Sequence, residues 1–169
     1  MNEGPERVQI LDARAARAKI NRMAFEIYES NFGAAELVVL GLNERGSYLA
    51  DLLAERLRAI SPIQVQQLRA LHRDHGFDIQ SDNPGKAIQG RPVLIVDDVL
   101  YSGTTLFKAM AAVLPLQPAR IQTAVLIDRG HRNLPVSHDF VGILLATTLQ
   151  QHVSVEIADV ENSAIAYVQ

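Results

Sequence analysis

Residues 94–106 of this chain have the sequence Leu-Ile-Val-Asp-Asp-Val-Leu-Tyr-Ser-Gly-Thr-Thr-Leu, and much of the architecture can be inferred outward from it. An apolar run of strand length leads to two adjacent carboxylates, Asp97 and Asp98, and then to a turn that opens a helix. The Ser-Gly-Thr-Thr turn presents backbone N–H groups and hydroxyls beside the positive end of the helix dipole, which suits a phosphate. The carboxylates can accept hydrogen bonds from vicinal hydroxyls of a sugar. We therefore expect a sugar phosphate site here, with ribose 5-phosphate as the natural fit.

Other interpretations of the same residues are weaker. Apolar residues followed by two aspartates also occur in Walker B strands, but the chain has no Gly-x-x-x-x-Gly-Lys-Ser/Thr segment. A dinucleotide-binding fold needs Gly-x-Gly-x-x-Gly after an early strand, and residues 41–46 do not supply it. In the simplest alternative, Asp97 and Asp98 only begin a loop and Ser102 or Thr104 caps a helix. The length of the matching stretch favours the phosphate site.

Apolar strands and amphipathic helices alternate along the chain. Asp12 can cap a first helix that ends at 31–33, and residues 43–46 form a tight connection into a second helix over 47–60. A third helix follows the Ser-Gly-Thr-Thr turn and ends near Leu114. Strands are expected at 36–42, 63–71, 92–96, 120–128, 140–145, 153–157 and 164–168. This alternation predicts an α/β fold, a doubly wound parallel sheet with helices on both faces.

Polar segments stand where several of these strands end. Residues 43–46, 97–105 and 128–132 each follow an apolar strand, and ligands of open parallel sheets bind beyond the carboxyl ends of the strands. We therefore expect these three segments to meet. Residues 72–90 show no periodicity and are rich in Gly, Asp and Asn, which predicts a long irregular loop that is functional or mobile.

Composition limits the classes of function. A chain of 169 residues corresponds to one domain, and the absence of Cys excludes disulfides, thiolate metal sites and a Cys nucleophile. The first residues contain no apolar signal segment and no apolar run is long enough to span a bilayer, so we expect a cytoplasmic protein that does not enter membranes. The net charge of −3 gives no general attraction for nucleic acid.

The stretch at 94–106 resembles the phosphoribosyl pyrophosphate (PRPP) signature of type I phosphoribosyltransferases. Residues 10–12, 46–57, 71–74 and 125–135 extend the resemblance to the family of pyrimidine-operon regulators and uracil phosphoribosyltransferases, the PyrR type. The likeness covers about residues 9–168. It implies a single domain over 1–169 with the phosphoribosyltransferase fold, a small hood at 129–139 and a mobile active-site loop at 72–90.

The resemblance also implies roles for individual residues. Asp97 and Asp98 are expected to hold the ribose hydroxyls and, with Arg45, to be the catalytic residues. The 5-phosphate is expected to bind Tyr101, Ser102, Gly103, Thr104 and Thr105. The pyrophosphate loop is Glu44, Arg45 and Gly46, the mobile-loop tip is Arg73 and Asp74, and the base meets Asp128, Arg129, His131 and Arg132. Glu44 departs from the family, which usually has Thr there. Mg²⁺ is expected to arrive with PRPP and to need no dedicated protein site.

Two functions follow from the resemblance. The first is an enzyme that makes UMP and pyrophosphate from uracil and PRPP, and the second is an RNA-binding attenuator that senses pyrimidine nucleotides. Arg22 and Arg132 match basic positions of the family's RNA surface, but Asn21 and Phe25 replace its usual Thr and His. Residues 136–139 and 142–144 also lack its cations, so we expect weak RNA binding. The resemblance further implies a homodimer or a larger homo-oligomer, and the identity of the base stays open.

Overall fold

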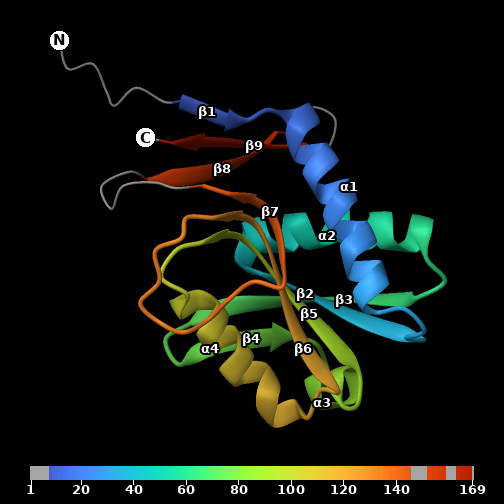
Figure 1. Ribbon diagram of the computed structural model, residues 1–169. Coiled ribbons are helices and arrows are strands. Elements are labelled where there is room, and N and C mark those ends of the chain that lie inside the picture. Colours follow the sequence, from blue (N-terminus) through green and yellow to red (C-terminus); the bar gives the residue numbers. More distant parts are fainter. Residues whose placement is uncertain (1–7, 146–151, 159–162, 169) are drawn as a thin grey trace.

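The computed structural model describes residues 8–145, 152–158 and 163–168 (Figure 1). The first seven residues, where the sequence shows no signal segment, lie outside this part. The helices are α1 (Ala13–Ser30), α2 (Asn43–Ile60), α3 (Pro84–Ile88) and α4 (Thr104–Val113), with a 3-10 turn at Leu114–Leu116. The strands are β1 (Val8–Leu11), β2 (Glu36–Leu42), β3 (Gln64–Arg73), β4 (Gly76–Gln80), β5 (Pro92–Leu100), β6 (Arg120–Asp128), β7 (Phe140–Leu144), β8 (Val153–Ala158) and β9 (Ser163–Val168). Within the described residues, no helix is long and apolar enough to cross a membrane.

The main sheet has six strands in the order β4-β3-β2-β5-β6-β7. All neighbours pair in parallel except β3 and β4, which form an antiparallel hairpin at one edge. From β2 the chain first continues to β3 on one side and later returns to β5 on the other. The strand order therefore reverses between β2 and β5, the position at which open α/β sheets bind ligands.

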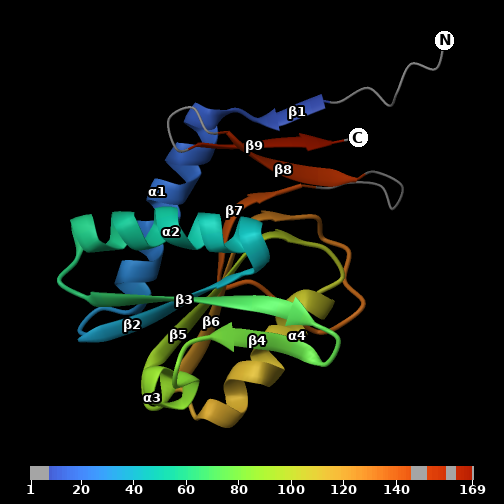
Figure 2. The ribbon, with the colours of Figure 1, turned by 180° about the vertical axis from the view of Figure 1, so that it is seen from behind.

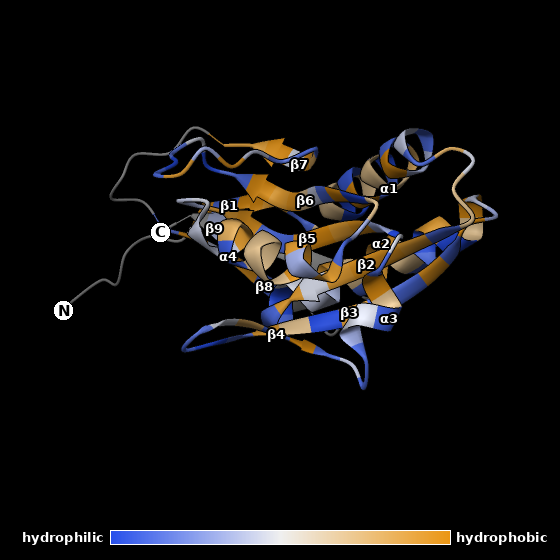
Figure 3. Cartoon of the chain, turned by 90° about the horizontal axis from the view of Figure 1, so that it is seen from below, coloured by the Kyte–Doolittle hydropathy of each residue, from blue (hydrophilic) through white to orange (hydrophobic). Residues whose placement is uncertain are grey.

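Helices cover both faces of this sheet, as the alternation of elements predicts (Figure 2). Helices α1 and α2 pack on one face, where Leu37 and Val39 of β2 point, and α3 and α4 pack on the other, with Val38 and Leu40. Burial on both faces explains why β2 and β5 are almost continuously apolar, and Figure 3 shows these strands in the hydrophobic colour. The expected α/β fold class is confirmed.

Three strands form a separate small sheet in the order β1-β9-β8, with antiparallel pairing throughout. We expected β8 and β9 as closing strands but did not expect β1. The segment that we assigned to the hood, 129–139, lies in the connection between β6 and β7, and its role as a hood stays a prediction. The small sheet combines the two ends of the described chain and lies beside β7 and α1 (Figure 1). Its pairing joins residues about 150 positions apart, which short-range patterns in the sequence do not show.

Two element boundaries differ from the sequence prediction. Helix α2 begins at Asn43, so residues 43–46 form its first turn instead of a connection before it. Strand β5 continues through Asp97 and Asp98 to Leu100, because Asp97 and Val99 still pair with β6. The acidic pair is therefore part of the sheet and is held by its hydrogen-bond ladder.

The prediction of an irregular loop at 72–90 is wrong. Strand β3 extends to Arg73, β4 returns from Gly76, and α3 follows with Asn83 as its N-cap, whose side chain accepts from Lys86 N at 2.9 Å. Both faces of this edge hairpin carry many polar residues, so its sequence lacks the apolar–polar alternation of a strand with one buried face. Whether this hairpin moves during function is a separate prediction that stays open.

Helix α2 packs against β2 with almost no separation. A side chain at Gly41 would place its Cβ 2.9 Å from the backbone N of Ser47 and still closer to Ser47 Cα. The Ser47 hydroxyl donates to Gly41 O at 3.2 Å and also to Asn43 O, which joins the strand to the first turns of the helix. Gly41 is therefore required by the close approach of two backbones.

Gly41→Ala should lower the free energy of unfolding by about 2–3 kcal/mol, because the clash is with backbone that cannot rotate away. Urea unfolding followed by circular dichroism measures the change. Gly85→Ala is the matched control, since its Cβ would meet nothing closer than Asn83 Oδ1 at 3.5 Å. Equal destabilisation by the two substitutions would contradict the role given to Gly41.

Candidate active site

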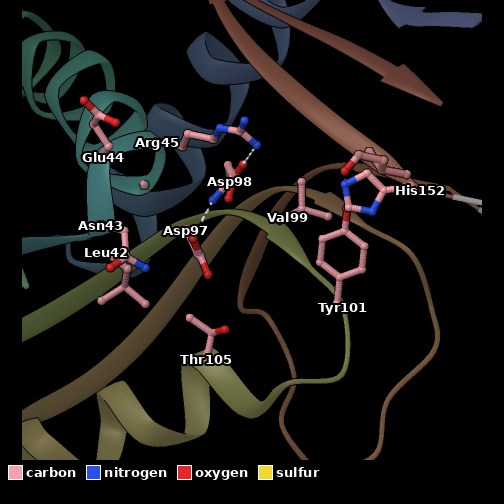
Figure 4. A pocket seen from close by; sticks show the side chains of 12 residues that line it. Leu42, Asn43, Glu44, Arg45, Asp97, Asp98, Val99, Tyr101, Thr105 and His152 are labelled. Atoms are coloured by element: carbon pink, nitrogen blue, oxygen red, sulfur yellow. Dashed lines mark hydrogen bonds and ion pairs between the residues drawn. The ribbon is translucent and has the colours of Figure 1, made fainter. Parts of the chain in front are cut away.

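A cleft of about 390 Å³ lies at the reversal of strand order, and several elements line it (Figure 4). The end of β2 and the first turn of α2 form one wall, and the end of β5 with the start of α4 forms another. His152 and Val153 contribute a third wall from the small sheet. The volume and the position at the carboxyl ends of parallel strands are typical of a ligand site in this fold.

The acidic pair lies on the floor of this cleft. Asp97 is only 7% exposed, and its carboxylate accepts a hydrogen bond from the backbone N of Asp98 at 3.0 Å. Burial, and then the neighbouring charge of Asp98, raise the pKa of Asp97 well above its ordinary value. Burial also raises the pKa of Asp98, although its own hydrogen bonds and Arg45 oppose the shift. The pair is poorly neutralised by the protein and is suited to accept hydrogen bonds from a ligand.

The first turn of α2 contacts β5 directly at this point. A Cβ on Gly46 would lie 2.6 Å from Val96 O and 3.1 Å from Asp97 Cα, so only glycine fits. This approach places the guanidinium of Arg45 3.9 Å from the Asp98 carboxylate. More than half of the Arg45 side chain stays exposed, which leaves most of its donors for a ligand. Glu44 is exposed, and its carboxylate points away from the acidic pair (Figure 4).

The turn before α4 has the geometry of an anion site. Gly103 has φ 83°, the left-handed region that favours glycine, and no side chain caps the helix. The Ser102 and Thr104 hydroxyl oxygens are 2.9 Å apart, and Thr105 lines the cleft. The Ser102 hydroxyl accepts from Thr104 N at 3.3 Å. The other backbone N–H groups of the first turn, at the positive end of the helix dipole, and these hydroxyls can together bind a phosphate.

Tyr101 connects the cleft to the small sheet. Its hydroxyl donates to Val153 O, and its ring stacks on His152 with 5.8 Å between centroids and 18° between planes. The Arg129 guanidinium carbon lies 4.7 Å from the centre of the same ring. Burial raises the pKa of Tyr101, so the hydroxyl keeps its proton and remains a donor. Tyr101 therefore fixes the third wall of the cleft.

The remaining predicted site residues fall into three groups. Arg129 and His131 line a smaller cavity of about 180 Å³ that shares Tyr101 with the cleft. Asp128 is 1% exposed, and its carboxylate accepts hydrogen bonds from Gly130 N and Arg132 and contacts His138. The expected contact of Asp128 and Arg132 with the base stays a prediction. Arg73 and Asp74 are exposed at the β3–β4 turn and do not line the cleft.

Sequence reasoning missed three residues that line the cleft. Leu42 ends β2, His152 directly precedes β8, and Val153 is the first residue of β8. None of these positions carries a motif, and β8 belongs to the small sheet, whose pairing joins distant parts of the chain. In the described part of the chain, no group of three or more His, Asp or Glu side chains is arranged to hold a metal ion.

A cleft at the switch point of a doubly wound sheet, with carboxylates on its floor and the start of a helix at its side, is typical of an α/β protein with a site suited to a sugar phosphate. The family described as phosphoribosyl transferase domain matches residues 6–160. Bifunctional protein pyrR of Enterococcus faecalis is 38% identical over 161 residues, covering 89% of this chain and 90% of its own. Bifunctional protein PyrR of Pelotomaculum thermopropionicum is 38% identical over 167 residues and 92% of each chain. The chain belongs to the type I phosphoribosyltransferase family and is PyrR-like within it.

Solved structures show the same fold at lower identity. A hypoxanthine-guanine phosphoribosyltransferase of Bacillus anthracis superposes with a TM-score of 0.75 and 19% identity, covering 95% of this chain and 97% of its own. The hypoxanthine phosphoribosyltransferase of Trypanosoma cruzi superposes with a TM-score of 0.74 and 19% identity, covering 94% of each chain. These similarities confirm the expected phosphoribosyltransferase fold.

The raised pKa of Asp97 predicts how stability depends on pH. A carboxyl whose pKa is raised by folding binds more protons in the native state, so stability falls as the pH rises through the raised pKa. Asp97→Asn should therefore unfold at higher urea concentration than the wild type at neutral pH. The difference should shrink as the pH is lowered and vanish near the ordinary aspartate pKa of about 3.9.

Urea unfolding at several pH values measures this difference. Asp82→Asn is the control, because Asp82 is exposed and its neutralisation should change stability little at any pH. A neutral-pH destabilisation by Asp97→Asn would show that burial of this carboxylate is compensated within the protein.

Proposed function

We propose that this protein is an enzyme that transfers the phosphoribosyl group of PRPP to uracil, giving UMP and pyrophosphate. The observation that carries the proposal is the single cleft that joins a carboxylate pair, an anion-binding turn and an arginine. Each part matches one portion of PRPP: vicinal ribose hydroxyls, 5-phosphate and pyrophosphate. Membership in the phosphoribosyltransferase family supports this assignment.

The ribose phosphate would bind across the end of β5. Its hydroxyls would donate to Asp97 and Asp98, and its 5-phosphate would accept from the turn at Gly103 and from Thr105. Arg45, on the opposite wall, would meet the pyrophosphate. This placement holds the anomeric carbon between the walls of the cleft, with the pyrophosphate directed toward the first turn of α2.

The reaction is a substitution at that carbon. A ring nitrogen of the base forms the new bond to carbon, the bond to the pyrophosphate oxygen breaks, and its electron pair leaves with pyrophosphate. The proton of the ring nitrogen passes to solvent. Positive charge that develops on the ribose is stabilised by Asp97 and Asp98, and Arg45 stabilises negative charge on the leaving group. No side-chain nucleophile is needed.

Mg²⁺ fits the residues of this site. Asp97 and Asp98 offer oxygen ligands, and burial raises the pKa of both carboxyls, so a cation bound beside them would favour their charged forms. Mg²⁺ commonly binds through one or two carboxylates together with substrate phosphates and water. When bound, Mg²⁺ would supply charge neutralisation for the pyrophosphate.

Uracil is proposed as the base from the likeness to the PyrR type. The relatives at 38% identity carry the name PyrR, whereas the hypoxanthine enzymes share the fold at 19% identity. The smaller cavity beside Tyr101 has polar side chains, Arg129, His131 and Asn133, that can meet the carbonyl oxygens of a pyrimidine. The cytoplasmic location and the assembly of two or more subunits remain predictions from the resemblance.

Asp97→Asn and Asp98→Asn should each lower turnover by about a hundredfold or more, because an amide cannot stabilise positive charge on the ribose. Pyrophosphate release from PRPP, measured with uracil and a panel of other free bases, tests activity and base preference together. Asp82→Asn is the control and should keep wild-type turnover. Full turnover in the double asparagine variant, or no PRPP binding by the wild type, would overturn the proposal.

RNA-dependent attenuation is the second candidate, since the relatives are named bifunctional. The structure accounts for the two cations that match the family's RNA surface. Arg22 donates to the carbonyl oxygens of Val141 and Gly142 at 2.8 and 2.9 Å, and Arg132 donates to Asp128. Both guanidinium groups therefore make hydrogen bonds within the protein. To bind an RNA phosphate they would first have to break these hydrogen bonds, and that cost would lower the affinity for RNA.

We expect a dissociation constant weaker than about 1 µM for a structured pyrimidine-operon leader RNA at near-physiological salt. Gel-shift titration with and without UMP measures it, with the Enterococcus faecalis relative titrated in parallel for comparison. A nanomolar complex that UMP strengthens would make attenuation equal in rank to the enzyme activity.

A further inference from the structure

The β3–β4 hairpin extends past the cleft edge of the main sheet. The pairing of β2 with β3 ends at Leu42 and Ala70, but β3 continues for three more residues to Arg73. Because parallel strands share a carboxyl edge, this extension lies on the side of the sheet where the cleft opens. The hairpin therefore extends beyond its last backbone pairing with β2, and other contacts must hold this extension in place.

Asn43 supplies the first of these contacts. At Asn43 the chain leaves β2 with φ 51°, a left-handed conformation that asparagine tolerates better than most residues, and enters α2. Its main chain can no longer continue the ladder, and its side-chain Oδ1 instead accepts from the backbone N of His72 at 2.9 Å. The side-chain oxygen of Asn43 thus accepts the hydrogen bond from β3 that a backbone carbonyl of β2 would have accepted if the ladder had continued.

His72 supplies a second contact, to helix α4. Its Nε2 lies 3.4 Å from Lys108 Nζ on α4, and its ring meets the edge of Phe77 on β4 at 5.4 Å between centroids. The hairpin is therefore attached both to the helix that follows the anion-binding turn and, through Asn43, to the first turn of α2. Asn43 itself lines the cleft immediately before Glu44 and Arg45.

We propose that Asn43 is a positioning residue that couples the β3–β4 hairpin to the pyrophosphate loop, residues 44–46. A pyrophosphate group bound at this loop stabilises the left-handed turn at Asn43, and the same turn holds the Asn43 amide against His72. By reciprocity, a docked hairpin strengthens pyrophosphate binding. This inference rests on the proposed function, because the ligand is the pyrophosphate portion of the donor.

Amide hydrogen exchange at His72 tests the coupling directly. Adding inorganic pyrophosphate with Mg²⁺ should slow exchange at His72 in the wild type. Asn43→Gly keeps access to the left-handed turn but removes the acceptor, so exchange should be about tenfold faster and no longer respond to pyrophosphate. Asn43→Asp keeps an acceptor oxygen and should restore the slow exchange.

Kinetics provide a second readout. Asn43→Gly should raise the KM for PRPP by about fivefold to tenfold, because the hairpin then no longer strengthens binding of the pyrophosphate portion. The KM for uracil should change little, because the hairpin does not line the smaller cavity. Equal His72 exchange in wild type and Asn43→Gly, with pyrophosphate bound to both, would overturn the coupling and leave the proposed function intact. Failure of the wild type to bind pyrophosphate would overturn the proposed function as well.

Discussion

The close approach between the first turn of α2 and the end of β5 is the constraint on which the site depends. Gly46 of α2 has no room for a side chain because Val96 O and Asp97 of β5 occupy the space. Gly41 of β2 likewise has no room, because the backbone of Ser47 in α2 occupies the space. This packing buries Asp97, brings Arg45 to Asp98 and turns the chain at Asn43. A helix displaced by the width of one methyl group would separate the arginine from the carboxylates and open the floor of the cleft.

Two buried aspartates in this protein have different surroundings. Asp128 has a backbone N–H, an arginine and a histidine around it, and it organises the connection between β6 and β7. Asp97 is nearly as buried, accepts a hydrogen bond from the backbone N of Asp98, and lies beside the like-charged Asp98. A buried carboxylate without compensation destabilises the fold, and this cost is consistent with the proposed role of Asp97 in binding a ligand.

Three parts of the chain that are distant in sequence converge on the site. The small sheet reaches it through Tyr101, which bonds to Val153 and stacks on His152, and the β3–β4 hairpin reaches it through Asn43. The connection between β6 and β7 is attached to the anion-binding turn, because Asn133 N donates to Ser102 O at 3.0 Å. The floor of the cleft belongs to the main sheet, and polar contacts join the surrounding segments to it.

The sequence alone determined the parts whose structure is set by neighbouring residues. The apolar run of β5, the left-handed glycine at position 103 and the start of α4 are contiguous, so their strand, turn and helix, and the anion site they form, could be predicted. The bounds of β6 and the Asp12 cap of α1 were predictable for the same reason. Only the tertiary structure decided that Asn43 belongs to α2, that residues 76–80 pair with β3, and that His152 and Val153 line the cleft. The tertiary structure also decided that Asp128 and Arg132 form an ion pair with each other. These features depend on contacts between residues far apart in the chain, where packing and antiparallel pairing override the local pattern.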